Sequence, residues 1–484
     1  MKTSKFALAL LGGASLALAG CGGGGGGGGS SPTPTPTQTP TPTPTPAPGT
    51  VCDESFVSCS GTTATLSGTI TKNFTLEAGF DWVLDGFVRV GEGNVEITSN
   101  AQANAIKAAG VTLTVPAGTD VRATDDGVLL ITRGSKLNVQ GTAANPVTFS
   151  SLDDGFDGLG EWGGIVVQGF APQYGAGNTG NCHGANSYCN VDGEGGGGVA
   201  KYGGSDPADN SGIVRYVRIA EGGLVAGPNN EVNGLTLQGV GHGTLIDYVQ
   251  VHNNLDDGVE WFGGTVNARH LVLTGNDDDD IDYDEGYMGN VQYAIIAKSA
   301  NAAPQGSNDP RGIEANSSDA DFVPQTMATL ANILLIGNNV NNAAGSEQPG
   351  MRLRGAVTTN VFNTAVRDFD TGCIRIDDAD TDGDGNTDVN SVVNLVNVLG
   401  ACADGFYDKR AADAETNAAA GTVTVDGAYA LTDAAASLGS AVTPTAINNG
   451  SGFAFEATDY IGAVAPGTPA ASAWWAEWII PGSL

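Results

Sequence analysis

Carboxylate side chains alternate with small residues in one short segment toward the C-terminus. The segment reads Asp380-Thr-Asp-Gly-Asp-Gly-Asn-Thr-Asp388, with acidic residues at positions 1, 3, 5 and 9 and glycine at position 6. This spacing matches the front of an EF-hand-type calcium loop, in which alternate carboxylates point inward and glycine permits the sharp bend. Position 12 usually holds a bidentate glutamate, and Ser391 stands there instead. The alternative is an acidic surface turn with hydrated carboxylates. The predicted Ca²⁺ ligands are Asp380, Asp382, Asp384, Asn386 and Asp388.

A second acidic group lies earlier in the chain. Residues 277–285 contain seven acids, and residues 256–260 contain three more. Asp256 and Asp278 are 22 residues apart, which is one interval of the repeat described below. Carboxylates stacked on successive turns of a coil would repel each other unless a cation lay between them. We therefore predict a second calcium site, and the alternative is a carboxylate pair for glycoside hydrolysis. Its predicted ligands are Asp256, Asp257, Glu260, Asp278, Asp280 and Asp282.

Short β-type runs recur at regular intervals and would position these acids. The first track has spacings of 32, 22 and 23 residues and consists of Tyr216-Val-Arg-Ile, Tyr248-Val-Gln-Val, His270-Leu-Val-Leu and Tyr293-Ala-Ile-Ile. The second track has spacings of 24 and 22 residues and consists of Leu235, Val259 and Ile281. Two tracks with a similar interval indicate a coil of parallel strands in which each rung stacks on the last. We predict an all-β fold, a right-handed parallel β-helix with inserted loops. An array of β-sandwiches is the alternative.

Several longer motifs resemble one known group of proteins. The stretch 127–151 carries the resemblance first, and further segments extend it over roughly residues 80–484. They include Glu161-Trp-Gly-Gly-Ile-Val-Val-Gln-Gly, Lys201-Tyr-Gly-Gly, Asp256-Asp-Gly-Val-Glu-Trp-Phe-Gly-Gly-Thr-Val, Asp278-Asp-Asp-Ile-Asp and Trp474-Trp-Ala-Glu-Trp. The group is a large, mostly uncharacterised family of exported proteins of Gram-negative bacteria. The resemblance implies a pectate-lyase-like β-helix on a surface lipoprotein, and it implies little about activity because fold alone does not define function.

An intact catalytic set is not found in the sequence. Polygalacturonase-type β-helix enzymes carry Asn-Thr-Asp, Asp-Asp, Gly-His-Gly and Arg-Ile-Lys in that order. Here Gly241-His-Gly precedes Asp256-Asp, and Arg375-Ile-Asp ends in an acid. A lyase needs an arginine or lysine base beside a bound cation, and Arg352 and Arg354 are available, but the sequence does not place them there. We therefore assign no catalytic residue and favour a non-catalytic role, with an enzyme as the open alternative.

The N-terminal 50 residues predict where the protein resides. Lys2 and Lys5 precede an apolar stretch, residues 6–19, that ends in small residues followed by Cys21. This layout is that of a secretory signal peptide. The small residues and the cysteine resemble a bacterial lipobox, which implies that Cys21 carries lipid after cleavage. A glycine run and a Pro-Thr tract then form a spacer, extended at about 3.1 Å per residue where it is polyproline II. We predict a lipid anchor in the outer membrane, with the protein on the cell surface or at the periplasmic face.

Domain boundaries follow from these features. We predict a signal peptide at 1–20, a lipidated linker at 21–50, an N-terminal β cap region at 51–110 and a β-helix body at 111–484. Trp474, Trp475 and Trp478 are predicted to cap the open end of the body, because a solenoid otherwise exposes strand edges there.

Charge and cysteine content limit the partners. The chain has 53 acidic and 20 basic residues and a net charge of −33, which excludes nucleic acid as an expected partner. Apart from Cys21, six cysteines remain in an oxidising compartment, so disulfides are expected, with fifteen possible connectivities. Proximity favours Cys52–Cys59, Cys182–Cys189 and Cys373–Cys402. We predict a calcium-stabilised, non-catalytic module that binds glycan or an outer-membrane protein. The alternative is a polysaccharide lyase or glycoside hydrolase of the pectin-lyase-like class.

Overall fold

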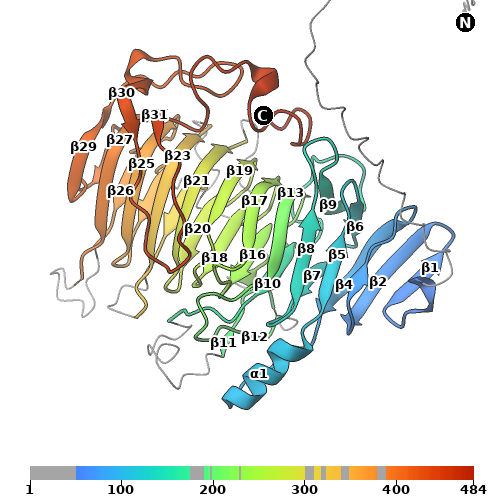
Figure 1. Cartoon of the computed structure of the whole chain (residues 1–484). Coiled ribbons are helices and arrows are strands. Elements are labelled where there is room, and N and C mark those ends of the chain that lie inside the picture. The colour runs from blue at the N-terminus through green and yellow to red at the C-terminus, as the bar shows by residue number, and fades with distance from the viewer. Residues whose placement is uncertain are drawn as a thin grey trace, which may run out of the picture. The chain divides into compact units, whose positions relative to one another are not determined.

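Parallel β-strands stack into one long coil in the computed structural model (Figure 1). The structure describes residues 51–174, 190–196, 199–227, 230–299, 310–317, 323–338, 348–378 and 389–484. They belong to one unit, Ala47–Leu484. In the described residues, 25 strands join into a single sheet that winds around the coil. The pairing in this sheet is parallel everywhere except between β1 (Val57–Ser60) and β2 (Thr63–Ile70). This confirms the predicted parallel β-helix and excludes the array of antiparallel sandwiches.

Two kinds of strand make up each rung in the middle and C-terminal parts of the coil. The short-strand sheet comprises β7 (Val128–Ile131), β10 (Ile165–Gln168), β16 (Leu235–Gln238), β18 (Val259–Phe262), β20 (Ile281–Asp284), β22 (Ile313–Ala315), β24 (Met351–Leu353), β26 (Ile374–Ile376) and β28 (Tyr407–Lys409). The long strands are β13 (Gly212–Ala220), β17 (Leu245–His252), β19 (Ala268–Thr274), β21 (Met288–Ala297), β23 (Met327–Ile336), β25 (Thr358–Arg367), β27 (Val392–Ala401) and β29 (Ala414–Ala420).

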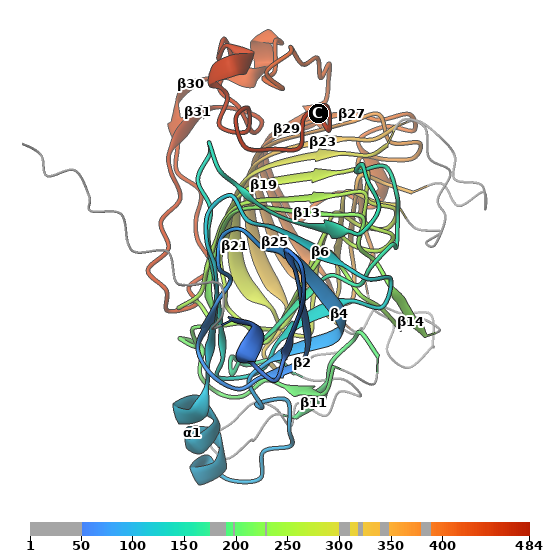
Figure 2. The same cartoon turned by 90° about the vertical axis from the view of Figure 1, so that its right-hand side faces the viewer.

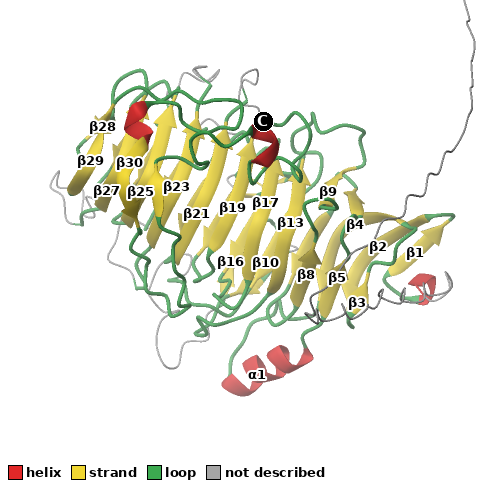
Figure 3. Cartoon of the chain, turned by 45° about the horizontal axis from the view of Figure 1, so that its top comes forward, coloured by secondary structure: helices red, strands yellow, loops and turns green. Residues whose placement is uncertain are grey.

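The coil begins with shorter strands near the N-terminus. These are β2 (Thr63–Ile70), β3 (Phe74–Thr75), β4 (Asp81–Val90), β5 (Thr112–Val115), β6 (Asp120–Ala123), β8 (Lys136–Gln140) and β9 (Val147–Ser151). Parallel pairing of β2 with β4 therefore falls within the segment expected to be a cap, residues 51–110. Strand β1 (Val57–Ser60) pairs antiparallel with β2 and follows a short helix, η1 (Val51–Asp53). Helix α1 (Asn100–Ala109) stands out from the side of the coil (Figure 3), and Ser99 caps it by accepting a hydrogen bond from the Gln102 amide.

Each long strand turns a corner at one residue with positive φ. Tyr216, Tyr248, His270 and Tyr293 occupy this corner on successive rungs, with φ between 51° and 66°. Their rings stack on each other at centroid distances of 4.3, 4.1 and 5.1 Å. Four later rungs place asparagine there, beginning with Asn332. The side chains of Asn363, Asn397 and Asn417 continue the ladder by amide hydrogen bonds of 2.8 and 2.9 Å. The predicted first track is thus confirmed as a corner of the coil, since asparagine tolerates the left-handed conformation and stacking offsets its strain for the aromatics.

Apolar residues fill the interior of the coil along the second predicted track. Leu235, Val259 and Ile281 are register partners in β16, β18 and β20, and all three are fully buried. Two of the expected disulfides are present. Cys52 joins Cys59 in the N-terminal segment, and Cys373 joins Cys402 beside the last rungs.

The C-terminal arm, residues 421–484, leaves the last rung and returns along the side of the coil (Figures 1 and 2). It contains the paired strands β30 (Ser437–Val442) and β31 (Thr458–Tyr460) and the short helices η2 (Ala434–Ala436) and η3 (Ala470–Ser472). Trp478 packs edge-on against Tyr216 and Tyr248, and Trp474 packs against His270. These two tryptophans therefore cover the aromatic corner of middle rungs, whereas the sequence led us to expect them at the open end.

Strand β29 pairs with β27, forms the last rung of the coil and is mostly exposed. Cys21, Cys182, Cys189 and the predicted calcium loop 380–388 lie outside the described residues. Among the described residues, no helix is both long and apolar enough to cross a membrane.

Candidate functional site

Three neighbouring short strands place acidic side chains on the outside of the coil. Side chains alternate along each strand, so residues on either side of an inward-facing one point outward. In β18, β20 and β22 the inward residues include Trp261, Tyr283 and Ala315, all fully buried in the core. The outward residues between the core positions are Glu260, Asp282 and Glu314, which are direct register partners. The parallel pairing therefore stacks three carboxylates on three consecutive rungs.

The turns before these strands add further carboxylates. Asp256 and Asp257 precede β18, while Asp278 and Asp279 precede β20. Together with the strand acids they form three overlapping groups of three, in each of which ligand oxygens lie within 4.8 Å of one another. The groups are Asp256 with Asp257 and Asp278, Asp257 with Glu260 and Asp282, and Asp279 with Asp282 and Glu314. We call these seven residues the acidic ladder.

Burial and mutual repulsion disfavour the ionised forms of the acidic ladder. The side chains of Asp257, Glu260 and Asp279 are no more than 8% exposed. Burial raises the pKa of each well above its usual value, and neighbouring carboxylates raise the pKa further. The pKa of Asp282 is raised by the same causes, burial first and then Glu314. So many carboxylates at this separation cannot all be ionised unless cations compensate them.

An insertion between β10 and β13 packs over the outer face of the ladder. It contains the small antiparallel pair β11 (Val191–Asp192) and β12 (Lys201–Tyr202) (Figure 1). Val191 and Tyr202 pack against Phe262, and the Tyr202 hydroxyl donates a hydrogen bond to Glu285. Glu194 of this insertion has its pKa raised to about 8, mainly by burial, with Glu231 and Asp282 adding repulsion. The insertion thus reduces solvent access and adds one more acid to the site.

Two basic side chains neutralise part of the negative charge. Arg311 contacts Asp279 at 3.2 Å and Glu314 at 2.8 Å, and it is almost fully buried. Lys298 forms an ion pair of 2.9 Å with Asp280, also within the interior. Asp280, which we predicted as a calcium ligand, does not belong to the three acidic groups. Its carboxylate is instead paired with the Lys298 ammonium group. Its pKa, raised to about 6 by burial, is held down by Lys298.

The charge of the outward positions changes sign along the coil. Glu314 pairs in register with Arg352 of β24, which pairs with Arg375 of β26. Arg352 and Arg375 both contact Asp377 at 3.1 Å, and Arg354 donates to Glu314 at 2.7 Å. An acidic half thus meets a basic half on one face, with Glu314 at the boundary.

The donor set suits a hard divalent cation. All ladder ligands are oxygens, and Ca²⁺ accepts six to eight oxygens in irregular geometry, whereas Mg²⁺ demands a near-octahedral arrangement. Asp282 belongs to two of the three groups, and its Oδ1 finds no hydrogen-bond partner among the described residues. Other oxygens are partly engaged: Asp257 accepts from the Asp279 amide at 2.9 Å, and Glu260 accepts from Asn233 at 2.5 Å. The residues present therefore fit a bound calcium ion.

The structure brings together most of the ladder acids predicted from the sequence and adds others. Asp256, Asp257, Glu260, Asp278 and Asp282 all belong to the three groups. Asp279 and Glu314 were missed as ligands. Glu314 had a detectable signal, because Gly312-Ile-Glu repeats the pattern of Gly258-Val-Glu before β18. The basic residues Arg311 and Lys298 carry no comparable signal, because they lie beside inserted loops.

The aromatic residues near the acids are structural. Trp162, Trp261, Tyr283 and Tyr287 are fully buried, so they fill rungs and offer no stacking surface for a ligand. Phe262 is the half-exposed exception, and the insertion covers it in part.

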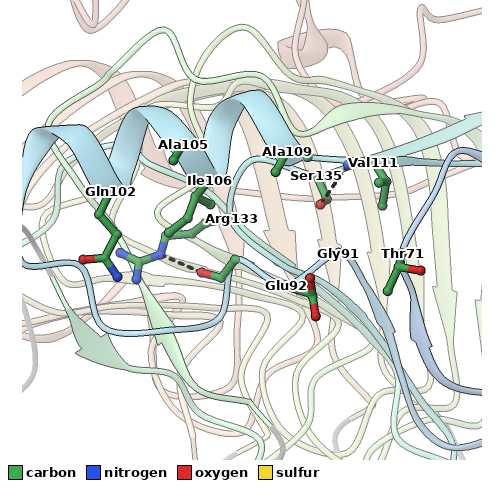
Figure 4. A pocket seen from close by; sticks show the side chains of 12 residues that line it. Thr71, Gly91, Glu92, Gln102, Ala105, Ile106, Ala109, Val111, Arg133 and Ser135 are labelled. Carbon is green, nitrogen blue, oxygen red and sulfur yellow. Dashed lines mark hydrogen bonds between the residues drawn. The ribbon is translucent and has the colours of Figure 1, made fainter.

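A separate hollow of about 260 Å³ lies between α1 and the coil (Figure 4). Ile106 and Ala109 of α1 form one wall, and Arg133 and Ser135 lie opposite. Arg133 Nε donates to the Gly93 carbonyl at 3.3 Å, and burial lowers the pKa of Arg133 to about 10. Ser135 Oγ accepts from the Val111 amide. These contacts fasten the turn around Gly134, so we regard the hollow as a packing feature of the helix.

Comparisons with known proteins agree with this architecture. The family model described as "Pectate-lyase like beta helix domain" matches residues 68–443. Because the match covers most of the chain, the protein belongs to the pectate-lyase-like β-helix family. No curated protein matches the sequence. A catalytic domain of a GH87 α-1,3-glucanase variant, solved with tetrasaccharides, matches at 11% identity and a TM-score of 0.24, covering 73% of this chain and 68% of that one. At that level of similarity nothing about function follows.

Proposed function

We propose that the protein is a calcium-dependent, non-catalytic binding module for glycan. The carrying observation is the acidic ladder, in which three overlapping groups of buried carboxylates are only partly balanced by Arg311. A divalent cation would relieve the repulsion and could offer open coordination positions to hydroxyl or carboxylate oxygens of a ligand. The arginines of β24 and β26 lie next along the same face and would contact the same extended chain.

The proposal includes the anchor predicted from the sequence. Lipid on Cys21 and the following spacer would hold the β-helix away from the outer membrane, where it would meet glycan or a membrane protein at the cell surface. Globomycin treatment of expressing cells, which blocks lipoprotein signal cleavage, tests the anchor independently of ligand binding. Accumulation of an uncleaved form supports it, and normal processing with soluble export contradicts it.

The direct test measures binding and cleavage on the same samples. Purified protein is mixed with neutral and acidic polysaccharides, with calcium and with chelator, and both retention and new chain ends are recorded. We expect strong binding in calcium, much weaker binding in chelator, and no new ends. Binding that is equally strong in chelator contradicts the proposal. Asp282→Asn should weaken the calcium-dependent binding, whereas Asp85→Asn, an exposed acid on β4, serves as the matched control.

One observation favours a catalytic alternative. Carboxyl groups whose pKa values lie far above the usual range can act as general acids near neutral pH, and the ladder contains several beside others that are charge-paired. A hydrolase or lyase would release new reducing or unsaturated ends. If these appear and Asp257→Asn abolishes them, the ladder is catalytic.

A further inference from the structure

The C-terminal arm and the coil together form a second, open cavity away from the acidic ladder. It has a volume of about 320 Å³ and lies between the arm at residues 451–454 and the coil at residues 242–247 and 267–269. None of its lining residues belongs to the acidic ladder. Its volume falls at the lower end of the range for small-molecule sites, about 300–1,000 Å³. We call it the arm cavity.

The walls of the arm cavity are fixed by contacts between distant parts of the chain. The Asn449 side chain donates to the Thr265 carbonyl, the Asn267 side chain and the Met288 carbonyl at 2.8–3.0 Å. Arg269 donates to the Ala454 carbonyl at 2.5 Å. The arm is therefore held in place on both sides of the cavity, and the cavity does not depend on a loose loop.

One wall offers a flat apolar surface. The Arg269 guanidinium carbon lies 4.5 Å from the centroid of the Phe453 ring. Phe453 is half-buried, so part of its ring remains accessible, and Leu245 nearby is 44% exposed. Stacking on the arginine orders the ring, which lowers the entropic cost of placing a ligand against it.

The same cavity contains buried polar atoms that need partners. Arg269 Nε and His242 Nδ1 are buried, and neither has a hydrogen-bond partner among the described residues. Buried polar atoms in proteins are nearly always hydrogen-bonded, so these two atoms keep hydrogen-bonding capacity that a bound hydroxyl group would use once the lining side chains shift to admit it. Asn267 and Thr244 add further polar positions to the lining.

Charges around the arm cavity are balanced within the protein. Asp247 contacts His270 at 2.8 Å and Arg215 at 3.5 Å, and Arg269 lies 3.8 Å from Glu456. A strongly anionic or cationic ligand would therefore gain little. An uncharged ligand that combines an apolar face with several hydroxyl groups fits both the ring and the polar atoms. A pyranose ring has this chemistry.

We propose that the arm cavity binds a sugar unit of a neutral glycan without any metal ion. This site goes beyond the calcium-dependent function, and either can fail without the other. With both sites in use, one glycan layer would be held at two points, and the affinity would exceed that of each site alone.

The test uses the full-length protein and tetrasaccharides of glucose, mannose or galactose in the presence of chelator. Saturation-transfer NMR and titration calorimetry measure the binding. We expect at least one sugar to bind with a dissociation constant of about 1 mM or lower. Phe453→Ala should weaken that binding about tenfold or more. Arg269→Lys, which keeps the charge but loses the planar group, should also weaken it.

Controls separate this site from general effects. Phe87→Ala removes the ring of another arginine–phenylalanine contact, 5.6 Å from Arg89, and should leave sugar binding unchanged. Asp85→Asn, at an exposed position of β4, should also leave it unchanged. The proposal is overturned if no tetrasaccharide binds in chelator. It is equally overturned if binding survives Phe453→Ala and Arg269→Lys in variants with wild-type unfolding temperatures.

Discussion

Replacing Asp282 by asparagine should change stability in opposite directions with and without calcium. Asp282 belongs to two of the three acidic groups, with ligand oxygens less than 4.8 Å apart. Two like charges at that distance repel by about 3.5 kcal/mol or more at an effective dielectric constant of about 20. Protonation already relieves part of this repulsion in the wild type, so we expect Asp282→Asn to stabilise the chelated protein by about 1–2 kcal/mol.

Calcium should reverse the sign because the variant loses a ligand. A hundredfold weaker affinity removes about 2.7 kcal/mol of calcium-linked stability, which outweighs the gain of about 1–2 kcal/mol expected in chelator. Urea unfolding followed by tryptophan fluorescence, in chelator and in millimolar calcium, measures both values, and calorimetry gives the calcium affinity. Asp85→Asn should have little effect in either condition. If Asp282→Asn destabilises the chelated protein as much as the calcium-loaded one, the carboxylate serves as a structural acceptor and the reasoning is refuted.

Four further outcomes are expected. In chelator, the free energy of unfolding should fall as pH rises from about 4.5 to about 8, because Glu194 keeps its proton up to a pKa of about 8 in the folded protein and loses it near 4.5 when unfolded; calcium should flatten this dependence. Replacing Cys373 and Cys402 by serine opens a loop of 29 residues and should cost about 3–4 kcal/mol, measured by urea unfolding. Trp478→Ala should cost about 3–5 kcal/mol and, in hydrogen exchange, expose the β13 and β17 amides beneath the arm. Asn397→Ala, at φ 54° in the amide ladder, should lower the free energy of unfolding by about 1–3 kcal/mol, as followed by thermal denaturation.

The repeat interval was readable from the sequence because stacking constrains residue types at fixed positions. Tyr216, Tyr248 and His270 occupy the corner of the coil, where a ring can stack on the ring of the next rung. Asp256 and Asp278 were placed on adjacent rungs by the same interval. Glu314 was not, because the chain between β20 and β22 is longer and separates Asp282 from Glu314 by 32 residues instead of 22.

The path of the C-terminal arm could not be inferred in the same way. Trp474 and Trp478 were recognised as cap residues, but a solenoid exposes apolar surface on its sides as well as its ends. The side is chosen by contacts between residues far apart in the sequence, such as the Arg218 guanidinium with the Trp478 carbonyl, 260 residues away. No local sequence pattern encodes such a pairing. The arm cavity, which results from it, could likewise not be predicted from the sequence.

The acidic ladder is the part of the coil that the fold itself does not explain. Rungs before it place Val166 and Thr236 at the equivalent outward positions, and rungs after it place arginines there, so the backbone tolerates apolar, polar and basic side chains alike. Stacking three carboxylates under an insertion that carries a fourth acid, Glu194, reduces stability unless a cation or protons compensate. A sequence that retains such a locally destabilising arrangement is expected to gain a function from it, because arrangements of this kind concentrate at functional sites. We therefore look for the ligand of this protein at the acidic ladder first. The effect of Asp282→Asn on stability, compared in chelator and in calcium, tests directly whether a cation binds there.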